Sequence, residues 1–243
     1  DDSDLYVFLE SLLRNPYVRY NGELIEERKG IMAGVPVSAF LANFYLRELD
    51  KYFFEKSVPY IRYSDDILVF AKDKSELDEC VAAIKSCLVL KHLNINPDKE
   101  TVTNPGEKWT FLGFSYQSGT IDISDVSFEK LKAKMRRKTR SLSRWASKKN
   151  LPGEYAARAF VKRFNTKLYD NPVYSELTWT RWFFPVINTD ETLKKIDEYM
   201  QDCIRYLATG KRTKSRYGFR YEDIKNLGYR NLVNEYYKFK DVE

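Results

Sequence analysis

Two adjacent aspartates are the residues best suited to chemistry in this sequence. Asp65 and Asp66 lie between two short apolar runs, residues 61–63 and 67–70, so we expect them at the turn of a hairpin. Uncompensated anions are costly in a buried turn, whereas Mg²⁺ takes carboxylate oxygens and commonly shares them with substrate phosphates. In a two-metal site the ions stabilise the attacking and leaving oxygens of an in-line phosphoryl displacement. A plain surface turn is the alternative interpretation.

Such a site generally takes carboxylates from more than one strand, and other reactive groups are scarce. Cys80, Cys87 and Cys203 have no metal-ligand spacing, and an odd number of cysteines argues against a disulfide framework. His92 is the only histidine, which excludes mechanisms that need a histidine pair. We expect Cys80 and Cys87 to be core thiols and His92 to be a surface or capping residue.

The composition is that of a globular protein. Of the 243 residues 43% are hydrophobic and 31% are charged, which excludes disordered and collagen-like chains. No apolar run approaches the roughly 20 residues that a membrane-spanning helix needs. The first residues lack the basic start and apolar stretch of a secretory signal. We therefore expect a cytoplasmic protein without a membrane partner.

Positive charge is concentrated in one segment. Residues 128–168 contain 14 Lys and Arg against 2 Asp and Glu, whereas residues 1–127 are net acidic. Apolar residues recur there at roughly helical spacing and predict an amphipathic helix with a cationic face: Phe128, Leu131, Met135, Leu142 and Trp145. A second basic stretch, residues 211–216, lies beside aromatic residues. Solvated helix surface is one interpretation, but the density of charge favours a surface for nucleic-acid phosphates.

The remaining pattern predicts the elements that position these groups. We expect helices over residues 5–13, from an N-cap at Ser38 to Phe53, and over residues 75–90. We expect a hairpin over residues 18–28 around Asn21-Gly22, and strands over residues 101–103 and 109–116. Beyond Ser127 the pattern is almost wholly helical. The predicted fold class is therefore α+β, with an α+β module over residues 1–126 and a helical module over residues 127–243.

Four segments, in order, resemble motifs of reverse transcriptases. The run Tyr63-Ser64-Asp65-Asp66 is similar to the YxDD catalytic hairpin of that family. Upstream, residues 30–38 and 42–46 resemble the family's glycine-proline-serine segment and the helix behind it. Downstream, residues 93–99 resemble its lysine-bearing loop, and residues 111–114 resemble its primer-grip hairpin. The style is that of bacterial enzymes of the group II intron, retron and abortive-infection type.

The resemblance implies an RNA-directed DNA polymerase that uses two Mg²⁺ ions, deoxynucleoside triphosphates (dNTP), an RNA template and a DNA primer. Asp65 would coordinate the ions directly, and Asp66 would assist or orient. Tyr63 would lie near the primer terminus. Lys99 would face the pyrophosphate leaving group as a charge stabiliser or proton donor, and an exposed turn lysine is the alternative.

Other positions would contact or position the substrate. Gly34 and Pro36 would let the backbone approach the nascent base pair, because glycine lacks Cβ and proline fixes φ, although a plain helix-entry turn would use the same residues. Asn43 would hold the loop or touch substrate, or it would be a structural polar group. Leu112 and Gly113 would position the primer strand, although a Leu-Gly pair is also ordinary in a hairpin.

The resemblance also assigns the two modules. Residues 1–126 would be part of a polymerase palm, an antiparallel sheet with helices on one face, and residues 127–243 would be an all-helical thumb. A thumb grips the template-primer duplex by its backbone and shape. The residues expected to contact phosphates are Lys132, Arg136, Arg137, Arg140 and Arg144. Four aromatic residues are expected in the core rather than as a base-stacking platform: Trp179, Trp182, Phe183 and Phe184.

The pattern departs from the family at its first catalytic strand. The family's other indispensable carboxylate belongs to an earlier strand, and no segment here matches it; Asp1, Asp2 and Asp4 precede a helix and lie too close to Gly34. The basic fingers region is also not found. We therefore expect the C-terminal portion of a palm, with one shared metal-binding carboxylate contributed by a missing upstream strand. That N-terminal polymerase segment would be a partner, and the chain alone would bind template-primer weakly without polymerising.

Two other functions stay open. A non-catalytic RNA-binding module, such as a maturase-like splicing cofactor, would retain the fold. A component of a defence complex would act only within an assembly. The intact Asp65-Asp66 pair favours the polymerase, since a pure binder gains nothing from two anions at a nucleic-acid surface.

Overall fold

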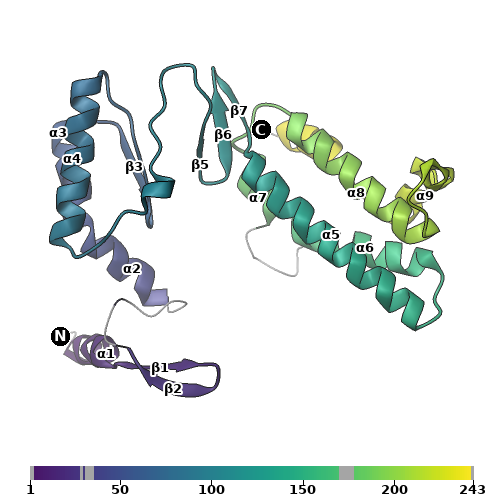
Figure 1. The fold of residues 1–243 in the computed structure, drawn as a ribbon, viewed down its shortest axis with the longest axis horizontal. Coiled ribbons are helices and arrows are strands. Elements are labelled where there is room, and N and C mark those ends of the chain that lie inside the picture. Colours follow the sequence, from purple (N-terminus) through teal and green to yellow (C-terminus); the bar gives the residue numbers. More distant parts are fainter. Residues whose placement is uncertain (1–2, 28–29, 31–35, 170–177, 242–243) are drawn as a thin grey trace. The chain divides into compact units, whose positions relative to one another are not determined.

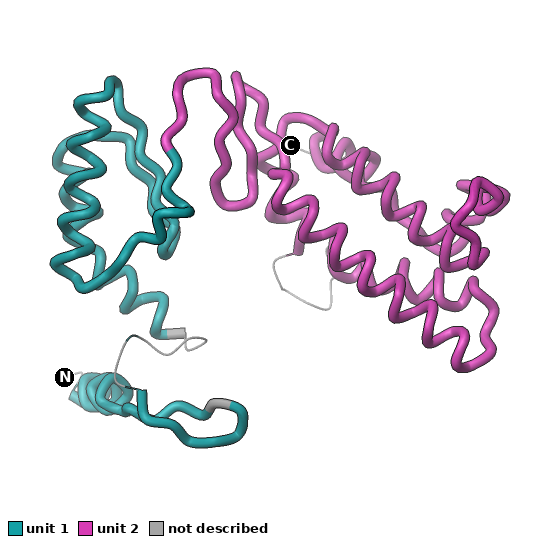
Figure 2. The backbone as a smooth tube through the Cα atoms, in the orientation of Figure 1, with its two compact units in different colours: residues 1–101 teal, residues 102–243 magenta. Residues whose placement is uncertain are grey.

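The chain forms two compact units, residues 1–101 and residues 102–243 (Figure 2). The computed structural model describes residues 3–27, 30, 36–169 and 178–241. Helices and small antiparallel sheets make up both units (Figure 1), so the predicted mixture of α and β structure is confirmed. None of the described helices is both long enough and apolar enough to cross a membrane.

Unit 1, residues 1–101, begins with a helix and a hairpin. Helix α1 spans Ser3–Arg14, and all of its residues are at least partly exposed. Strands β1 (Tyr17–Tyr20) and β2 (Glu23–Glu26) pair antiparallel. Asn21 and Gly22 connect them with φ angles of 50° and 91°, as a type I′ turn requires. The predicted helix and hairpin are confirmed.

The helix predicted from Ser38 to Phe53 is in fact two helices. Helix α2 spans Pro36–Tyr45 and helix α3 spans Arg47–Lys56. Pro36 occupies the first helical position, where its fixed φ suits the helix and its missing N–H is not needed, so the N-cap predicted at Ser38 is wrong. Leu46 separates the helices because its φ of −99° and ψ of 7° are not helical.

The second hairpin of unit 1 contains the paired aspartates. Strands β3 (Tyr60–Tyr63) and β4 (Asp66–Val69) pair antiparallel, as predicted. Among the described residues neither strand pairs with a third, so each keeps one unpaired edge. Helix α4 (Lys74–Leu90) follows, and it begins at Asp73, whose side chain accepts the Glu76 N–H. The helix predicted over residues 75–90 is confirmed.

The core of unit 1 is small. It comprises Leu49, Phe53 and Cys80, and the Phe53 ring stacks on Tyr60 with 4.4 Å between their centroids. The core position predicted for Cys80 is confirmed. A short 3₁₀ helix, η1 (Pro97–Lys99), follows α4. The strand predicted over residues 101–103 is wrong, since these residues pair with no strand in the described part of the chain.

Unit 2, residues 102–243, begins with a three-stranded sheet. Strands β5 (Trp109–Phe111), β6 (Phe114–Gln117) and β7 (Thr120–Ile123) pair antiparallel in that order. The single strand predicted over residues 109–116 is wrong, because a turn at Leu112 and Gly113 reverses the chain. The sheet belongs to the same compact unit as the helices after it. The palm–thumb boundary at residue 126 is a functional division and stays a prediction.

After the sheet, every regular element that the structure describes is helical, as predicted. The elements are α5 (Asp125–Lys148), α6 (Gly153–Leu168), α7 (Trp179–Phe183), α8 (Glu191–Thr209), the 3₁₀ helix η2 (Lys214–Gly218), α9 (Tyr221–Asn226) and α10 (Leu232–Lys240). Helices α5, α6 and α8 pack against one another (Figure 1). One continuous core includes residues from Phe114 in β6 to Tyr236 in α10.

The basic helix predicted from the charge pattern is α5. Its buried face contains Leu131, Met135 and Leu142, as predicted. Trp145 is 37% exposed, because Ala146 rather than its neighbour continues the buried stripe. The core position predicted for the four aromatic residues around α7 is confirmed: Phe183 and Phe184 are buried, and Trp179 and Trp182 pack against them.

A glycine sets the distance between α6 and α8. A Cβ at Gly153, the first residue of α6, would lie 2.4 Å from the Leu207 carbonyl oxygen and 2.5 Å from that of Ala208. Both oxygens belong to the backbone of α8, so neither can move like a side chain. Only glycine lets the two helices approach this closely.

A buried carboxylate organises the start of α10. Asp197 in α8 is 3% exposed and accepts hydrogen bonds from the Tyr229 hydroxyl and from the N–H groups of Leu232 and Val233. These bonds satisfy donors at the first turn of a helix, where no intrahelical acceptor exists. Burial raises the pKa of Asp197, because the hydrogen bonds only partly compensate for the loss of water.

Candidate active-site hairpin and basic surface

The paired aspartates lie at the tip of the β3–β4 hairpin in unit 1. Tyr63 and Asp66 are opposite each other, so Ser64 and Asp65 form a two-residue turn. The predicted hairpin is confirmed, but Asp66 is the first residue of β4 rather than a turn residue. Ser64 has a φ of 58°, the positive value that the first central residue of a type II′ turn requires. A serine in this conformation is strained by about 1–2 kcal/mol, so its surroundings must hold it there.

Both carboxylates are open to solvent. Asp65 and Asp66 are exposed, and neither side chain makes a hydrogen bond or an ion pair with a described residue. Tyr63, at the end of β3, is 56% exposed on the same hairpin. Two neighbouring carboxylates without a cationic partner repel each other and are stabilised by a cation that both can reach.

A buried arginine holds the turn. The Arg62 side chain is 6% exposed and forms an ion pair with Asp50 of α3, its Nε donating to Oδ1 at 2.8 Å. Its Nη1 donates to the Ser64 carbonyl oxygen at 3.0 Å and to Asn43 Oδ1 of α2 at 3.0 Å. Arg62 thus connects the strained turn to both α2 and α3. Asn43 thus makes a structural hydrogen bond, and its predicted roles in holding the glycine-proline loop or touching substrate stay predictions.

The ion pair sets the charge states around Arg62. Hydrogen bonding to Arg62 lowers the pKa of the Asp50 carboxyl, and Asp50 raises the pKa of Arg62. The Tyr60 hydroxyl donates to Asp50 Oδ1 at 2.9 Å, and burial together with this bond raises the pKa of Tyr60. All three groups therefore keep one charge state near neutral pH, and the contact with Ser64 does not titrate there.

Arg62, Tyr60 and Asp50 were not among the site residues predicted from the sequence. No sequence pattern identified the first two, because only the structure shows that Tyr60 and Arg62 are less exposed than Ile61 and Tyr63 and share the inner face. An arginine on an inner face requires an anionic partner. No feature of the sequence identified Asp50 as that partner.

The hairpin fits a divalent cation in the type of its ligands. Carboxylate oxygens are the hard ligands that Mg²⁺ takes. In the described part of the chain no group of three or more His, Cys, Asp or Glu residues is arranged to hold a metal ion. Asp65 and Asp66 would therefore be two carboxylates of a larger ligand set.

The structure places some of the other predicted residues of unit 1. Gly34 lies outside the described residues, and Pro36 begins α2. Lys99 ends η1, where it is exposed and has no carboxylate partner among the described residues. Its backbone N–H donates to the Asn96 carbonyl oxygen at 3.0 Å. The main chain at Lys99 is therefore fixed while its ammonium group can meet an anion.

The predicted primer-grip residues form the β5–β6 turn in unit 2. Leu112 and Gly113 have φ angles of 50° and 90°, the two positive values of a type I′ turn. The Trp182 indole N–H donates to the Leu112 carbonyl oxygen at 3.3 Å, and a Cβ at Gly113 would lie 2.8 Å from the Ser127 hydroxyl oxygen. The turn therefore packs on α5 and α7, and the φ of 90° at Gly113 together with this packing favours a glycine.

Most of the cations predicted to contact phosphates have no anionic partner. Four of the predicted arginines are exposed and have no carboxylate of a described residue within 4.0 Å: Arg136, Arg137, Arg140 and Arg144. Lys132 differs, since it pairs with Glu129 at 2.9 Å and lies over the rings of Phe128 and Tyr199. Exposed guanidinium groups without carboxylates are a suitable surface for a phosphate backbone.

Comparison with known proteins supports the resemblance for the part of the chain that contains the hairpin. A family model described as "Reverse transcriptase (RNA-dependent DNA polymerase)" matches residues 4–116. The match extends from α1 to β6 and leaves the basic helices outside it. A search of curated proteins found no match. Residues 4–116 therefore have the sequence pattern of a reverse transcriptase domain.

Proposed function

We propose that this chain is the C-terminal palm and thumb portion of an RNA-directed DNA polymerase of the bacterial reverse transcriptase type and that the reaction takes place at the β3–β4 hairpin. One observation carries the proposal: Asp65 and Asp66 are consecutive, exposed residues at a hairpin tip, inside the segment that matches the reverse transcriptase family. The Arg62 contacts support it, because they hold the strained turn in one conformation.

The reaction adds one deoxynucleotide to a primer. The primer 3′-oxygen loses its proton and bonds to the α-phosphorus of a dNTP, while the bond from that phosphorus to pyrophosphate breaks. Asp65 would hold two Mg²⁺ ions and Asp66 would assist from the start of β4. Bound Mg²⁺ would supply charge stabilisation at the attacking and leaving oxygens. Lys99 would donate a proton to the departing pyrophosphate or stabilise its charge.

The other site residues would position the substrates. Tyr63 would lie beside the primer terminus, and Asn43 would hold the hairpin through Arg62. The backbone at Gly34 and Pro36 would approach the nascent base pair. Leu112 and Gly113 would support the primer strand from the β5–β6 turn.

The basic surface of α5 would hold the duplex of RNA template and DNA primer. Its exposed arginines supply the positive charge that contacts with successive phosphates need. These contacts are independent of base sequence, as a polymerase requires. In this assignment residues 127–243 act as the thumb.

Two hairpin carboxylates are insufficient for the reaction by themselves. A two-metal site takes a shared carboxylate from a further strand, and the described residues bring no third metal ligand to Asp65 and Asp66. An upstream palm strand would supply that carboxylate. The 243 residues alone are therefore expected to bind template-primer weakly and not to extend it.

Primer extension tests the proposal. The reaction contains an RNA template, an annealed DNA primer, dNTP and Mg²⁺, and the chain is supplied with and without the segment encoded upstream of Asp1. Asp65→Asn is expected to lower extension at least about a hundredfold, since charge stabilisation by the ions is worth several kcal/mol. Asp78→Asn is the matched control, because Asp78 is an exposed α4 residue whose one ion-pair partner among the described residues is Lys74.

Each other outcome has a separate meaning. Extension that Asp65→Asn leaves unchanged would contradict the site assignment. RNA binding without extension, even with the upstream segment, would favour the non-catalytic RNA-binding or defence-complex function. Extension by the 243 residues alone would show that the two hairpin carboxylates need no further strand.

A further inference from the structure

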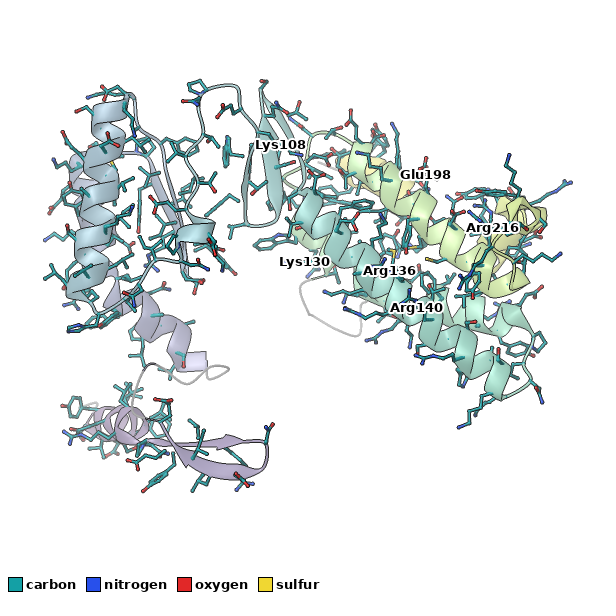
Figure 3. The ribbon with its side chains drawn as sticks, viewed as in Figure 1. Lys108, Lys130, Arg136, Arg140, Glu198 and Arg216 are labelled. Carbon is teal, nitrogen blue, oxygen red and sulfur yellow. The ribbon has the colours of Figure 1, made fainter. Side chains whose placement is uncertain are left out.

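A cavity of about 400 Å³, widely open to solvent, lies between α5, α8 and the segment that follows α8 in unit 2. Cationic side chains dominate its lining, which includes Arg136, Arg140, Lys211, Arg212 and Arg216 with the single carboxylate of Asp202. Figure 3 shows Arg136 and Arg140 on α5 and Arg216 near the end of α8. The fold thus brings the two basic stretches of the sequence together at one place.

Asp202 does not neutralise this charge. Its carboxylate accepts a hydrogen bond from Arg216 Nη2 at 2.8 Å and lies 3.8 Å from Arg205 Nη1, so two guanidinium groups already share it. Two further lining cations come from α5. Arg136 and Arg140 have no carboxylate within 4.0 Å among the described residues. The cavity therefore carries uncompensated positive charge, which an anion would stabilise.

The cations on the α8 side are held in place before any ligand binds. Arg216 Nη1 donates to the Arg212 carbonyl oxygen at 2.7 Å. Arg212 lies over the Tyr206 ring, and hydrogen bonding from Arg212 lowers the pKa of the Tyr206 hydroxyl. Guanidinium groups that are already ordered lose less entropy when they bind a ligand.

The cavity differs from the rest of the α5 surface. Arg137 and Arg144 are exposed on the same helix, yet they do not line it. Cations that converge on one volume suit a group with more than one negative charge. A phosphate monoester carries about −1.5 to −2 at pH 7, more than a phosphodiester within a strand.

We propose that this cavity binds the terminal phosphate of a nucleotide, presented either by the 5′-phosphorylated end of a nucleic-acid strand or by a free nucleotide. The choice of a nucleotide rests on the proposed function. The cavity has the size of small-ligand sites. Tyr199 and Tyr206 in its lining add aromatic surface for a base.

Binding measurements on the full chain test this proposal with three probes: a 5′-phosphorylated oligonucleotide, the same oligonucleotide with a 5′-hydroxyl, and dATP. The phosphorylated strand is expected to bind about tenfold more tightly than the hydroxyl one, or dATP is expected to bind on its own. The double variant Arg136→Gln/Arg140→Gln should abolish that preference or that binding. Both arginines are exposed, so the variant is expected to fold.

Two further double variants serve as controls. Lys130→Gln/Lys134→Gln removes the same charge from α5 outside the cavity and should leave the preference intact. Arg137→Gln/Arg144→Gln should weaken both oligonucleotides equally and reduce the dependence of affinity on salt. Its effect reports on the duplex-binding surface, independently of the cavity.

The outcomes separate the cavity from the proposed function. A 5′-phosphate preference lost only in Arg136→Gln/Arg140→Gln identifies a strand end, and dATP binding lost in that variant identifies a free nucleotide. If neither ligand depends on these arginines while oligonucleotides still bind, the cavity proposal is overturned and the polymerase stands. If neither oligonucleotide nor dATP binds, the cavity proposal is overturned, and if a template-primer duplex does not bind either, the thumb role assigned to α5 fails with it.

Discussion

The two compact units are stabilised in different ways. Unit 2 has a continuous core of buried apolar residues contributed by its sheet and helices. Unit 1 buries only a small cluster around Phe53, on which Tyr60, Ile67 and Val69 of the hairpin pack, and the ion pair between Arg62 and Asp50 adds a polar contact between the hairpin and α3. The difference indicates that a large apolar core organises the basic unit, whereas a small apolar cluster together with polar contacts positions the hairpin that contains the candidate catalytic aspartates.

The largest expected effect separates the two cores. Phe53→Ala should destabilise unit 1 by about 3–5 kcal/mol, because Phe53 is 1% exposed and stacks on Tyr60. Since the small core of unit 1 offers little reserve, we expect this unit to unfold while unit 2 stays native. All four tryptophans lie in unit 2, so their fluorescence reports on that unit alone, and amide hydrogen exchange reports on unit 1.

Phe160→Ala is the matched variant in unit 2. Phe160 is fully buried in α6, and its truncation should lower the midpoint of the tryptophan transition. A tryptophan transition that Phe53→Ala shifts as much as Phe160→Ala does would show that the two units unfold as one, and the comparison would fail.

A smaller effect tests how closely unit 2 is packed. Gly153→Ala should destabilise unit 2 by about 2 kcal/mol, because its Cβ would meet two backbone oxygens of α8. The sign of this change in stability is informative. In a helix where nothing contacts the added Cβ, replacing glycine by alanine stabilises by about 1 kcal/mol. Urea unfolding followed by tryptophan fluorescence measures the change.

Gly218→Ala is the control for that variant. Nothing lies within 4 Å of a Cβ at Gly218, in the same unit, so its unfolding midpoint should change little. Equal midpoints for Gly153→Ala and Gly218→Ala would contradict the close approach of α6 and α8.

The smallest expected effect concerns pH. Arg62 holds the pKa of Asp50 below its ordinary value of 3.8, so the stabilisation from this pair is complete above that pH and is lost as the pH falls through the lowered pKa. Asp50 is partly exposed, so we expect a contribution below about 1 kcal/mol. In Asp50→Asn, the hydrogen-exchange protection of unit 1 should therefore depend less on pH below about pH 4 than in the unchanged protein.

Asp197 should show the opposite sign in unit 2. Burial raises the pKa of Asp197, so its protonation as the pH falls increases the free energy of unfolding of unit 2. Asp197→Asn should remove this gain in stability at low pH. If Asp50→Asn and Asp197→Asn changed the pH dependence in the same direction, the contrast between the two carboxylates would be wrong.

The sequence predicted those elements whose pattern is long or sharply bounded. Helices α4 and α5 were predicted because apolar residues recur at helical spacing over several turns. The turn at Asp65 was predicted because apolar runs flank it on both sides. The apolar pattern alone missed the β5–β6 turn, since Leu112 continues an apolar run, whereas the resemblance of residues 111–114 to a primer-grip hairpin placed a reversal there.

Contacts between distant residues could not be predicted in the same way. Arg62 meets Asn43 and Asp50 because α2, α3 and β3 come together, and no local pattern specifies that arrangement. The cavity depends equally on the packing of α5 beside α8, which places Arg136 near Arg216. The chemistry of single residues was therefore accessible from the sequence, while their partners required the fold.

The open edges of the β3–β4 ribbon have a consequence for handling the protein. Among the described residues, each of these strands offers one row of main-chain donors and acceptors to no other strand. Such rows template pairing with a neighbouring molecule. Fragments limited to unit 1 should thus self-associate at high concentration through intermolecular sheet extension. A fragment that stays soluble would need the unpaired edges of β3 and β4 covered.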